Sequence, residues 1–268
     1  GDGSGIDKLA KTVNRGEKVS FSQEKAVTLL YGNTDVVFHR EEDSGNIAGM
    51  IAMYIGRITE SSRFQLDDIQ VLCPQKIGPI GSNALNAFLR DRIYNPNGEE
   101  IKGTRGKFRI GDRVIQGRNN YDIGIFNGET GRILCAYRKT VRIRFDGKES
   151  PEVFYPIPEM EDDLSLAYAM SVHRSQGSEF RVVVMPVHTT NWIMLKQDLF
   201  YTGITRAKEA LVLIGTDKAV DIAMRTLDGR VRYSALADRL RSGAADSLFR
   251  LNQEYERREP EVLAGEAL

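Results

Sequence analysis

The spacing of apolar residues divides the chain into two kinds of pattern. Apolar side chains recur at helical spacing over residues 44–60 and 82–94, and a short continuous apolar run, Ile69 to Cys73, lies between these segments and ends at Pro74. The second half predicts strands at Leu166–Met170, Val182–Met185 and Leu211–Ile214, with a helix opening near Ser171 and another just before Arg206. Strands that alternate with helices predict a parallel sheet.

The middle of the chain has a different, shorter period. Alternating runs at residues 112–116, 123–126, 130–134 and 140–145 predict short strands, and Asn127-Gly128 and Asp146-Gly147 supply tight turns. Strands of this length and spacing predict a small five-stranded barrel. Within the last run, alternation places Arg142 and Arg144 on the outer face, where they are able to meet phosphates.

These patterns predict an α/β parallel-sheet domain that is split by an inserted barrel. We expect the first part of the sheet domain at residues 1–101, the barrel at 102–158, the second part of the sheet domain at 159–242 and a tail at 243–268. Residues 1–5 read as a cloning remnant or a loop, and we left them out of the predicted fold.

Charge is segregated although the 268 residues sum to a formal net charge of zero. Residues 102–148 hold 12 Lys or Arg against 4 Asp or Glu, so the remainder is acidic to the same extent. The basic stretch either binds nucleic acid or packs on the acidic remainder. No apolar run approaches the roughly 20 residues of a membrane span. Cys73 and Cys135 read as buried free thiols, which fits a reducing cytoplasm.

The segment from Tyr168 to Phe180 carries the densest chemistry. It gathers hydroxyls, an imidazole, an amide, a glycine and a carboxylate where a predicted strand turns into a predicted helix. Such a junction exposes backbone N–H groups that favour an anion, typically a phosphate. The alternative is purely structural, with Ser171 as a helix cap and His173 as a solvated side chain.

A second segment, Phe200 to Glu209, ends a predicted helix just before a strand. Arg206 lies there, and a permanently charged guanidinium suits the γ-phosphate of a nucleotide. The alternative is an ion pair between Arg206 and a neighbouring carboxylate such as Glu209.

Together, the two segments resemble motifs V and VI of superfamily 1 helicases in the RecD-like branch. Asn14-Arg15-Gly16-Glu17 resembles the "INRG" element of that family, and residues 69–81 with Ala84-Leu85-Asn86 resemble motif IV. The predicted barrel stands where this family has an inserted SH3-like subdomain. The resemblance extends to about Leu240 and implies a RecA-like fold.

The resemblance also implies roles for individual residues. Arg206 matches the arginine finger, which stabilises charge on the transferred phosphoryl group. The implied nucleotide-binding residues are Lys76, Gly177 and Glu179, with Lys76 standing where relatives commonly have arginine. The implied contacts to single-stranded DNA are Ser171, His173 and Ser175. Arg142, Arg144 and Tyr121 of the barrel are further candidates for DNA contact.

Two motifs that an ATPase needs are missing from the sequence. Neither Gly106-Lys107 nor Gly147-Lys148 completes a phosphate-binding loop, and no apolar strand ends in an Asp-Glu pair suited to Mg²⁺. In the family these motifs belong to a preceding RecA-like domain, which we expect as a partner. The prediction is therefore one motor half of an ATP-dependent helicase, inactive alone, that needs ATP and Mg²⁺ in the complete protein. The family resemblance, and not the residues themselves, implies movement from 5′ to 3′.

Two other functions fit the same residues. The helicase portion of a conjugative relaxase has the same motor motifs, and other subunits of a nuclease-helicase complex are possible partners of either kind of helicase. A non-catalytic module that binds nucleic acid or a protein partner is the alternative from a different class. The joint presence of Gln176, Glu179 and Arg206 argues against that module.

Overall fold

The computed structural model describes residues 3–19, 26–32, 34–147 and 152–226. The α-helices are α1 (Gly5–Asn14), α2 (Ile47–Glu60), α3 (Ser82–Leu89), α4 (Ile157–Asp163), α5 (Gln197–Ile204) and α6 (Asp217–Arg225). The strands are β1 (Val27–Leu29), β2 (Val36–Arg40), β3 (Ile69–Cys73), β4 (Arg113–Gln116), β5 (Thr130–Tyr137), β6 (Thr140–Phe145), β7 (Glu152–Pro156), β8 (Leu164–Leu166), β9 (Ala169–Ser171), β10 (Phe180–Val187) and β11 (Ala207–Gly215). No helix in these ranges is long and apolar enough to span a bilayer.

A six-stranded sheet forms the centre of the α/β region, in the order β1-β2-β11-β10-β3-β9. Every neighbouring pair is parallel except β1 and β2, which are antiparallel. Because alternate residues of a strand point to opposite faces, Val183 and Met185 of β10 join one hydrophobic cluster, and Val182 and Val184 join the other. The continuous apolar strands of the sequence are therefore buried on both faces.

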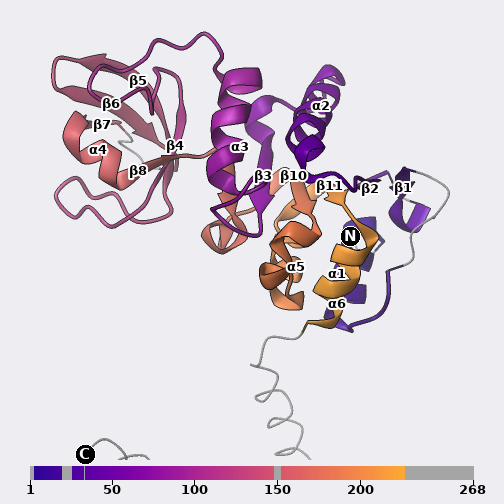
Figure 1. Cartoon of the computed structure of the whole chain (residues 1–268). Coiled ribbons are helices and arrows are strands. Elements are labelled where there is room, and N and C mark those ends of the chain that lie inside the picture. Colours follow the sequence, from indigo (N-terminus) through magenta and orange to yellow (C-terminus); the bar gives the residue numbers. More distant parts are fainter. Residues whose placement is uncertain (1–2, 20–25, 33, 148–151, 227–268) are drawn as a thin grey trace, which may run out of the picture. The chain divides into compact units, whose positions relative to one another are not determined.

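Helices cover both faces of this sheet, as Figure 1 shows. One face packs against α1, α5 and α6, with Leu9, Phe200 and Val220 in a shared cluster. The other face packs against α2 and α3, with Ile51 and Leu85 in a second cluster. The α/β class and the parallel sheet were predicted correctly from the alternation of strands and helices.

A second sheet has five strands in the order β7-β6-β5-β4-β8, all antiparallel. Its core is a separate cluster that includes Phe108, Phe145 and Tyr155, and α4 adds Met160. The cluster draws residues from Ile101 to Leu164, and β8 extends the sheet to Leu166. We call the described residues of 101–166 the β module. It reaches beyond residue 158, where the sequence placed the end of the barrel.

Several predicted elements differ from the observed ones. Residues 123–126 form no strand, since only an isolated bridge joins Asn120 to Ile125. The predicted strand at 166–170 is two strands, because β8 ends at Leu166 in the second sheet and β9 begins at Ala169 in the first. The helix expected near Ser171 is a short 3₁₀ turn, Val172–Ser175. It ends at Gln176, whose ψ of 130° is not helical, and Gly177 follows with φ of 82°.

The N-terminal residues also contribute more than expected. The Ser4 hydroxyl accepts a hydrogen bond from Asp7 N at 3.1 Å and caps α1, so Ser4 and Gly5 belong to the fold. The predicted tail at 243–268 and the family resemblance over 230–240 lie outside the described residues. Cys73 is a buried free thiol as expected, whereas Cys135 is only partly buried.

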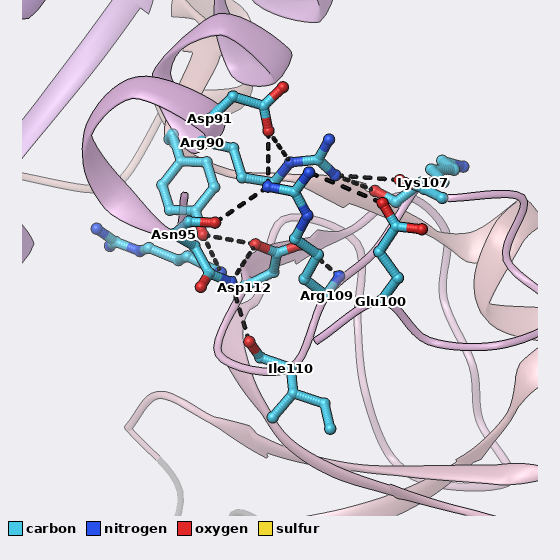
Figure 2. Close-up of polar contacts among 11 residues, drawn as sticks. Arg90, Asp91, Asn95, Glu100, Lys107, Arg109, Ile110 and Asp112 are labelled. Carbon is cyan, nitrogen blue, oxygen red and sulfur yellow. Dashed lines mark hydrogen bonds and ion pairs between the residues drawn. The ribbon is translucent and has the colours of Figure 1, made fainter. Parts of the chain in front are cut away.

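Polar contacts fix the β module to the segment after α3 (Figure 2). The buried carboxylate of Asp112 accepts hydrogen bonds from Asn95 Nδ2 at 2.8 Å, Tyr168 Oη at 2.9 Å and Arg109 N at 2.7 Å. Arg90, also buried, donates to the carbonyl of Lys107 at 3.0 Å. We call these contacts the junction network. These hydrogen bonds compensate the buried charge of Asp112. Because hydrogen bonds are directional, they favour one arrangement of the β module against the segment after α3.

Candidate nucleotide and nucleic-acid sites

The segment that resembles motif V leaves the sheet at its edge strand. Ser171 ends β9, the 3₁₀ turn follows, and the chain re-enters the sheet at Phe180 as β10. Ser175 is fully buried and its hydroxyl donates to the carbonyl of Val172 at 2.7 Å. The side chain of Ser175 therefore stabilises the turn, and this geometry does not support the predicted contact with DNA. His173 and Gln176 are exposed on the same turn.

A pocket of about 710 Å³ lies beside this turn. From the α/β region, Lys76, Ser171 and His173 line it, together with Gln176 and Ser178. Lys76 follows the carboxyl end of β3, whose residue Cys73 pairs with Ser171 of β9, so adjacent strand ends bring the ammonium group and the hydroxyl into one pocket. This is the edge at which open α/β sheets bind ligands.

The β module supplies the other wall of the pocket. Gly117, Asn127, Gly128 and Glu129 line it from the loop between β4 and β5. The absent side chain of Gly117 permits a close approach, because a Cβ there would lie 3.2 Å from Arg174 Nη2 and 2.8 Å from the carbonyl oxygen of Asp163. Partial burial of the Arg174 guanidinium lowers its pKa through desolvation. No local pattern in the sequence predicts that this loop meets motif V.

Arg206 lies outside that pocket, immediately before β11. Its guanidinium donates to the carbonyl of Ser178 at 3.0 Å and to the carbonyl of Thr202 at 3.2 Å. Glu209 pairs instead with Arg181 at 2.5 Å and with Arg63 at 3.1 Å, so the predicted alternative pairing is wrong. No carboxylate of the described ranges forms an ion pair with Arg206. Its guanidinium is therefore oriented by carbonyl oxygens and not by a carboxylate.

Glu179 lies next to Arg206 because β10 and β11 are parallel neighbours, with Phe180 opposite Ala207. The Glu179 carboxylate is exposed and pairs with Lys208 at 2.7 Å. That hydrogen bond, helped by the charge of Arg206, lowers the pKa of Glu179. Gly177 precedes this cluster with a left-handed backbone that favours glycine. Lys208 is a member that sequence reasoning missed, although it stands two residues from Arg206.

The strands separate the predicted site residues into two groups. Ser171 and Lys76 lie at the carboxyl ends of β9 and β3, whereas Glu179 and Arg206 lie at the amino ends of β10 and β11. Lys76 was predicted to join the nucleotide-binding group. The structure places it in the pocket with Ser171 and His173 instead.

The arginines of the β module are largely paired within the chain. Arg142 and Arg144 point outward as predicted, and both form ion pairs with Glu152 of β7, at 3.5 and 2.6 Å. The hydrogen bond from Arg144 lowers the pKa of Glu152. Arg132 pairs with Asp67 at 2.6 Å, and this acid lies outside the basic stretch. The positive stretch therefore meets acids from the rest of the chain, which favours the packing alternative.

Two families of known domains match this chain. Residues 166–214 match the UvrD-like helicase C-terminal domain, and residues 85–145 match the SH3 domain of ATP-dependent RecD-like DNA helicases. The chain contains the C-terminal helicase domain of a RecD-like helicase. The first match covers β9 to β11 with Ser171 and Arg206, and the second runs from α3 to β6 of the β module. The RecD-like assignment and the SH3-like module predicted from the motifs are thereby confirmed.

Curated relatives extend the RecD-like assignment. The ATP-dependent RecD2 DNA helicase of Deinococcus radiodurans is 35% identical over 178 residues, which cover 65% of this chain and 24% of that protein. The RecBCD enzyme subunit RecD of Buchnera aphidicola subsp. Schizaphis graminum is 27% identical over 195 residues, which cover 72% of this chain and 30% of that protein. The RecD-like chain thus spans less than a third of the length of these relatives.

Solved structures of Pif1 helicases also align with the RecD-like chain. The crystal structure of Pif1 helicase from Bacteroides in complex with ADP-AlF3 and ssDNA is 17% identical. The alignment covers 76% of this chain and 55% of that one, with a TM-score of 0.44.

Proposed function

We propose that this chain is the C-terminal motor half of an ATP-dependent DNA helicase or translocase that moves 5′ to 3′. It supplies an arginine finger and contacts to single-stranded DNA, while a preceding RecA-like domain supplies the phosphate-binding loop. The observation that carries the proposal is Arg206, a guanidinium that two carbonyl oxygens orient and that forms no ion pair with a carboxylate of the described residues.

The amino ends of β10 and β11 form the nucleotide-facing edge in this proposal. Arg206 reaches the phosphoryl group that is transferred, where its fixed charge stabilises the transition state. Gly177 and Glu179 border the nucleotide, with Glu179 held by Lys208. ATP and Mg²⁺ supply the phosphoryl group and its countercharge. Within the described ranges no cluster of three His, Cys, Asp or Glu residues is able to hold a metal ion, so the proposal takes the Mg²⁺ ligands from the preceding domain.

The pocket beside motif V forms the strand-facing surface. Lys76 offers an exposed ammonium group, and Ser171 and His173 offer hydrogen-bonding groups to the same space. Such a set suits phosphate oxygens and does not read base sequence, so binding is expected to tolerate any sequence and to weaken with salt. In this proposal Lys76 binds strand phosphates, and Ser175 only positions the turn.

Strand binding is tested with a fluorescently labelled single-stranded oligonucleotide, using anisotropy at about 50 and about 200 mM salt. Affinity should fall steeply between the two concentrations, and Lys76→Ala should weaken binding and flatten the salt dependence. Lys218→Ala, an exposed lysine of α6, removes the same charge away from the pocket and should leave binding unchanged. Absence of binding at the lower salt, or equal losses in the two variants, contradicts the strand-facing surface.

The arginine finger is tested by ATP turnover. Alone, this chain should show no turnover above background, and steady turnover that Arg206→Ala abolishes contradicts the proposal. In the longer polypeptide with its phosphate-binding loop, Arg206→Ala should lower DNA-stimulated turnover by about 10³-fold or more, with nucleotide affinity much less affected. Arg225→Ala, an exposed arginine in the last turn of α6, should retain full turnover.

A further inference from the structure

The loop between β4 and β5 is a pre-formed hairpin. Asn120 and Ile125 exchange two backbone hydrogen bonds, at 2.7 and 3.0 Å. Asn127 N donates to Asn119 Oδ1 at 2.9 Å, and Gly128 N donates to the carbonyl of Gln116 at 2.9 Å. These bonds connect the tip, the sides and the base of the loop. The loop therefore presents its side chains in a defined arrangement without a partner to order it.

Two aromatic side chains lie on this hairpin in contact with solvent. Tyr121 is 77% exposed and Phe126 is 44% exposed. Their ring centroids are 6.1 Å apart and the planes meet at 77°, an edge-to-face pair. In such a pair the edge of one ring meets the face of the other, and most of the Tyr121 side chain remains in contact with solvent. The Tyr121 hydroxyl accepts a hydrogen bond from Asn119 Nδ2 at 3.1 Å, which helps to orient the exposed ring.

The aromatic pair lies on the same hairpin that lines the pocket beside motif V. Phe126 directly precedes Asn127 in the chain, and Asn127 lines that pocket together with Ser171 and His173. The backbone N–H of Phe126 is bonded to the carboxylate of Glu129 at 3.2 Å, so this acid of the pocket wall is engaged in holding the hairpin. The hairpin that carries the exposed rings thus also supplies part of the pocket wall.

We propose that Tyr121 and Phe126 form a base-stacking platform for a single strand whose phosphates lie in the pocket. This inference rests on the proposed function and adds a contact to the bases. Every nucleobase has a π-face, so stacking adds affinity without sequence preference. The pocket next to the hairpin favours a nucleic acid over an apolar protein surface, because it offers the amide of Asn127 on the hairpin's own wall and the Lys76 ammonium group and the His173 imidazole on the opposite wall.

The platform is tested with two oligonucleotides of equal length, one carrying bases that include 2-aminopurine and one abasic throughout. Tyr121→Leu removes the ring and keeps an apolar side chain at an exposed position, whereas Tyr121→Phe keeps the ring. Tyr137→Leu is the matched control, because Tyr137 is 65% exposed on β5 and lies outside the hairpin. Binding is measured by anisotropy, and stacking by quenching of 2-aminopurine fluorescence.

Tyr121→Leu should weaken binding of the base-containing strand about tenfold and relieve the quenching, while binding of the abasic strand stays unchanged. Tyr121→Phe and Tyr137→Leu should behave like the wild type. If the wild type binds both strands and Tyr121→Leu alters neither, or weakens both equally, the platform is overturned and the strand-facing surface survives. If the wild type binds neither strand, the proposed strand surface falls and the platform with it.

Discussion

The six-stranded sheet and the β module expose their chemistry in opposite ways. The sheet is buried on both faces, and its candidate functional residues lie where strands begin or end, as Ser171 and Arg206 do. The β module buries only its inner face, and its outer face carries Tyr137 and Phe154, each 65% exposed. Its candidate contacts lie on a loop. A sheet that helices cover on both faces exposes functional side chains only at its strand ends and edges. A sheet with one solvent-exposed face also exposes side chains on that face.

Charge follows the same division. The one guanidinium that we assign to a nucleotide, Arg206, is bonded to carbonyl oxygens, whereas the outward arginines of the β module are bonded to a carboxylate. Net charge of a segment is therefore a poor guide to where an anion binds. The position of each acid partner decides which positive charge is available.

The largest expected effect tests whether the two regions have independent cores. Phe145→Ala in the β module and Phe38→Ala in the sheet each remove a buried ring and should lower the free energy of unfolding by ~3–5 kcal/mol. Hydrogen exchange should then show lost protection mainly over β4–β6 for Phe145→Ala and over the six-stranded sheet for Phe38→Ala. Equal loss of protection over the whole chain in both variants would mean that the two cores unfold as one.

A smaller effect is expected at the junction network. Asp112→Asn keeps the shape but replaces one acceptor oxygen by a donor, which then faces a donor, so the free energy of unfolding should fall by ~1–3 kcal/mol. Asp91→Asn is the control, because the Asp91 carboxylate pairs with Arg90 at 3.1 Å and with Arg109 at 2.7 Å beside the junction network (Figure 2) and its side chain is 50% exposed. Denaturant unfolding should show a change below ~1 kcal/mol for that control. Equal changes in the free energy of unfolding for the two variants would show that the buried Asp112 carboxylate contributes no more than the half-exposed one.

The smallest effect concerns the paired arginines. Glu152→Gln removes the carboxylate that Arg142 and Arg144 share, so single-strand binding should become tighter by at most about fivefold, the equivalent of ~1 kcal/mol for exposed pairs. Glu60→Gln, at the exposed end of α2, changes the net charge equally and should have less effect in oligonucleotide titrations at low salt. Identical gains would show that only net charge matters.

The sequence predicted the sheet region better than the β module. The apolar pattern is strong in α2, β3, β10 and β11. The helix buries one face against the sheet, and the strands are buried on both faces. The run at 123–126 has the same local alternation but forms no strand, since the hairpin bonds of Asn120 and Ile125 define its backbone. Local pattern does not reveal which strand a segment pairs with.

Only part of the candidate site could be predicted from the sequence, for a related reason. The motif resemblance selected Arg206 and Ser171 as candidate site residues. The apolar pattern predicted that each lies next to a strand. Three features depend on how the chain folds around each residue. They are the burial of Ser175, the pairing of Arg144 with Glu152 and the position of Gly117 in the pocket wall. No local pattern records such contacts.

The short connection between β8 and β9 has a mechanical consequence. Leu166 ends a strand of the β module and Ala169 begins a strand of the other sheet, so only Ala167 and Tyr168 separate them, and both are buried. A tether this short has no slack. A displacement of β8 would therefore require movement of these two residues or of β9, which ends at Ser171 beside the pocket.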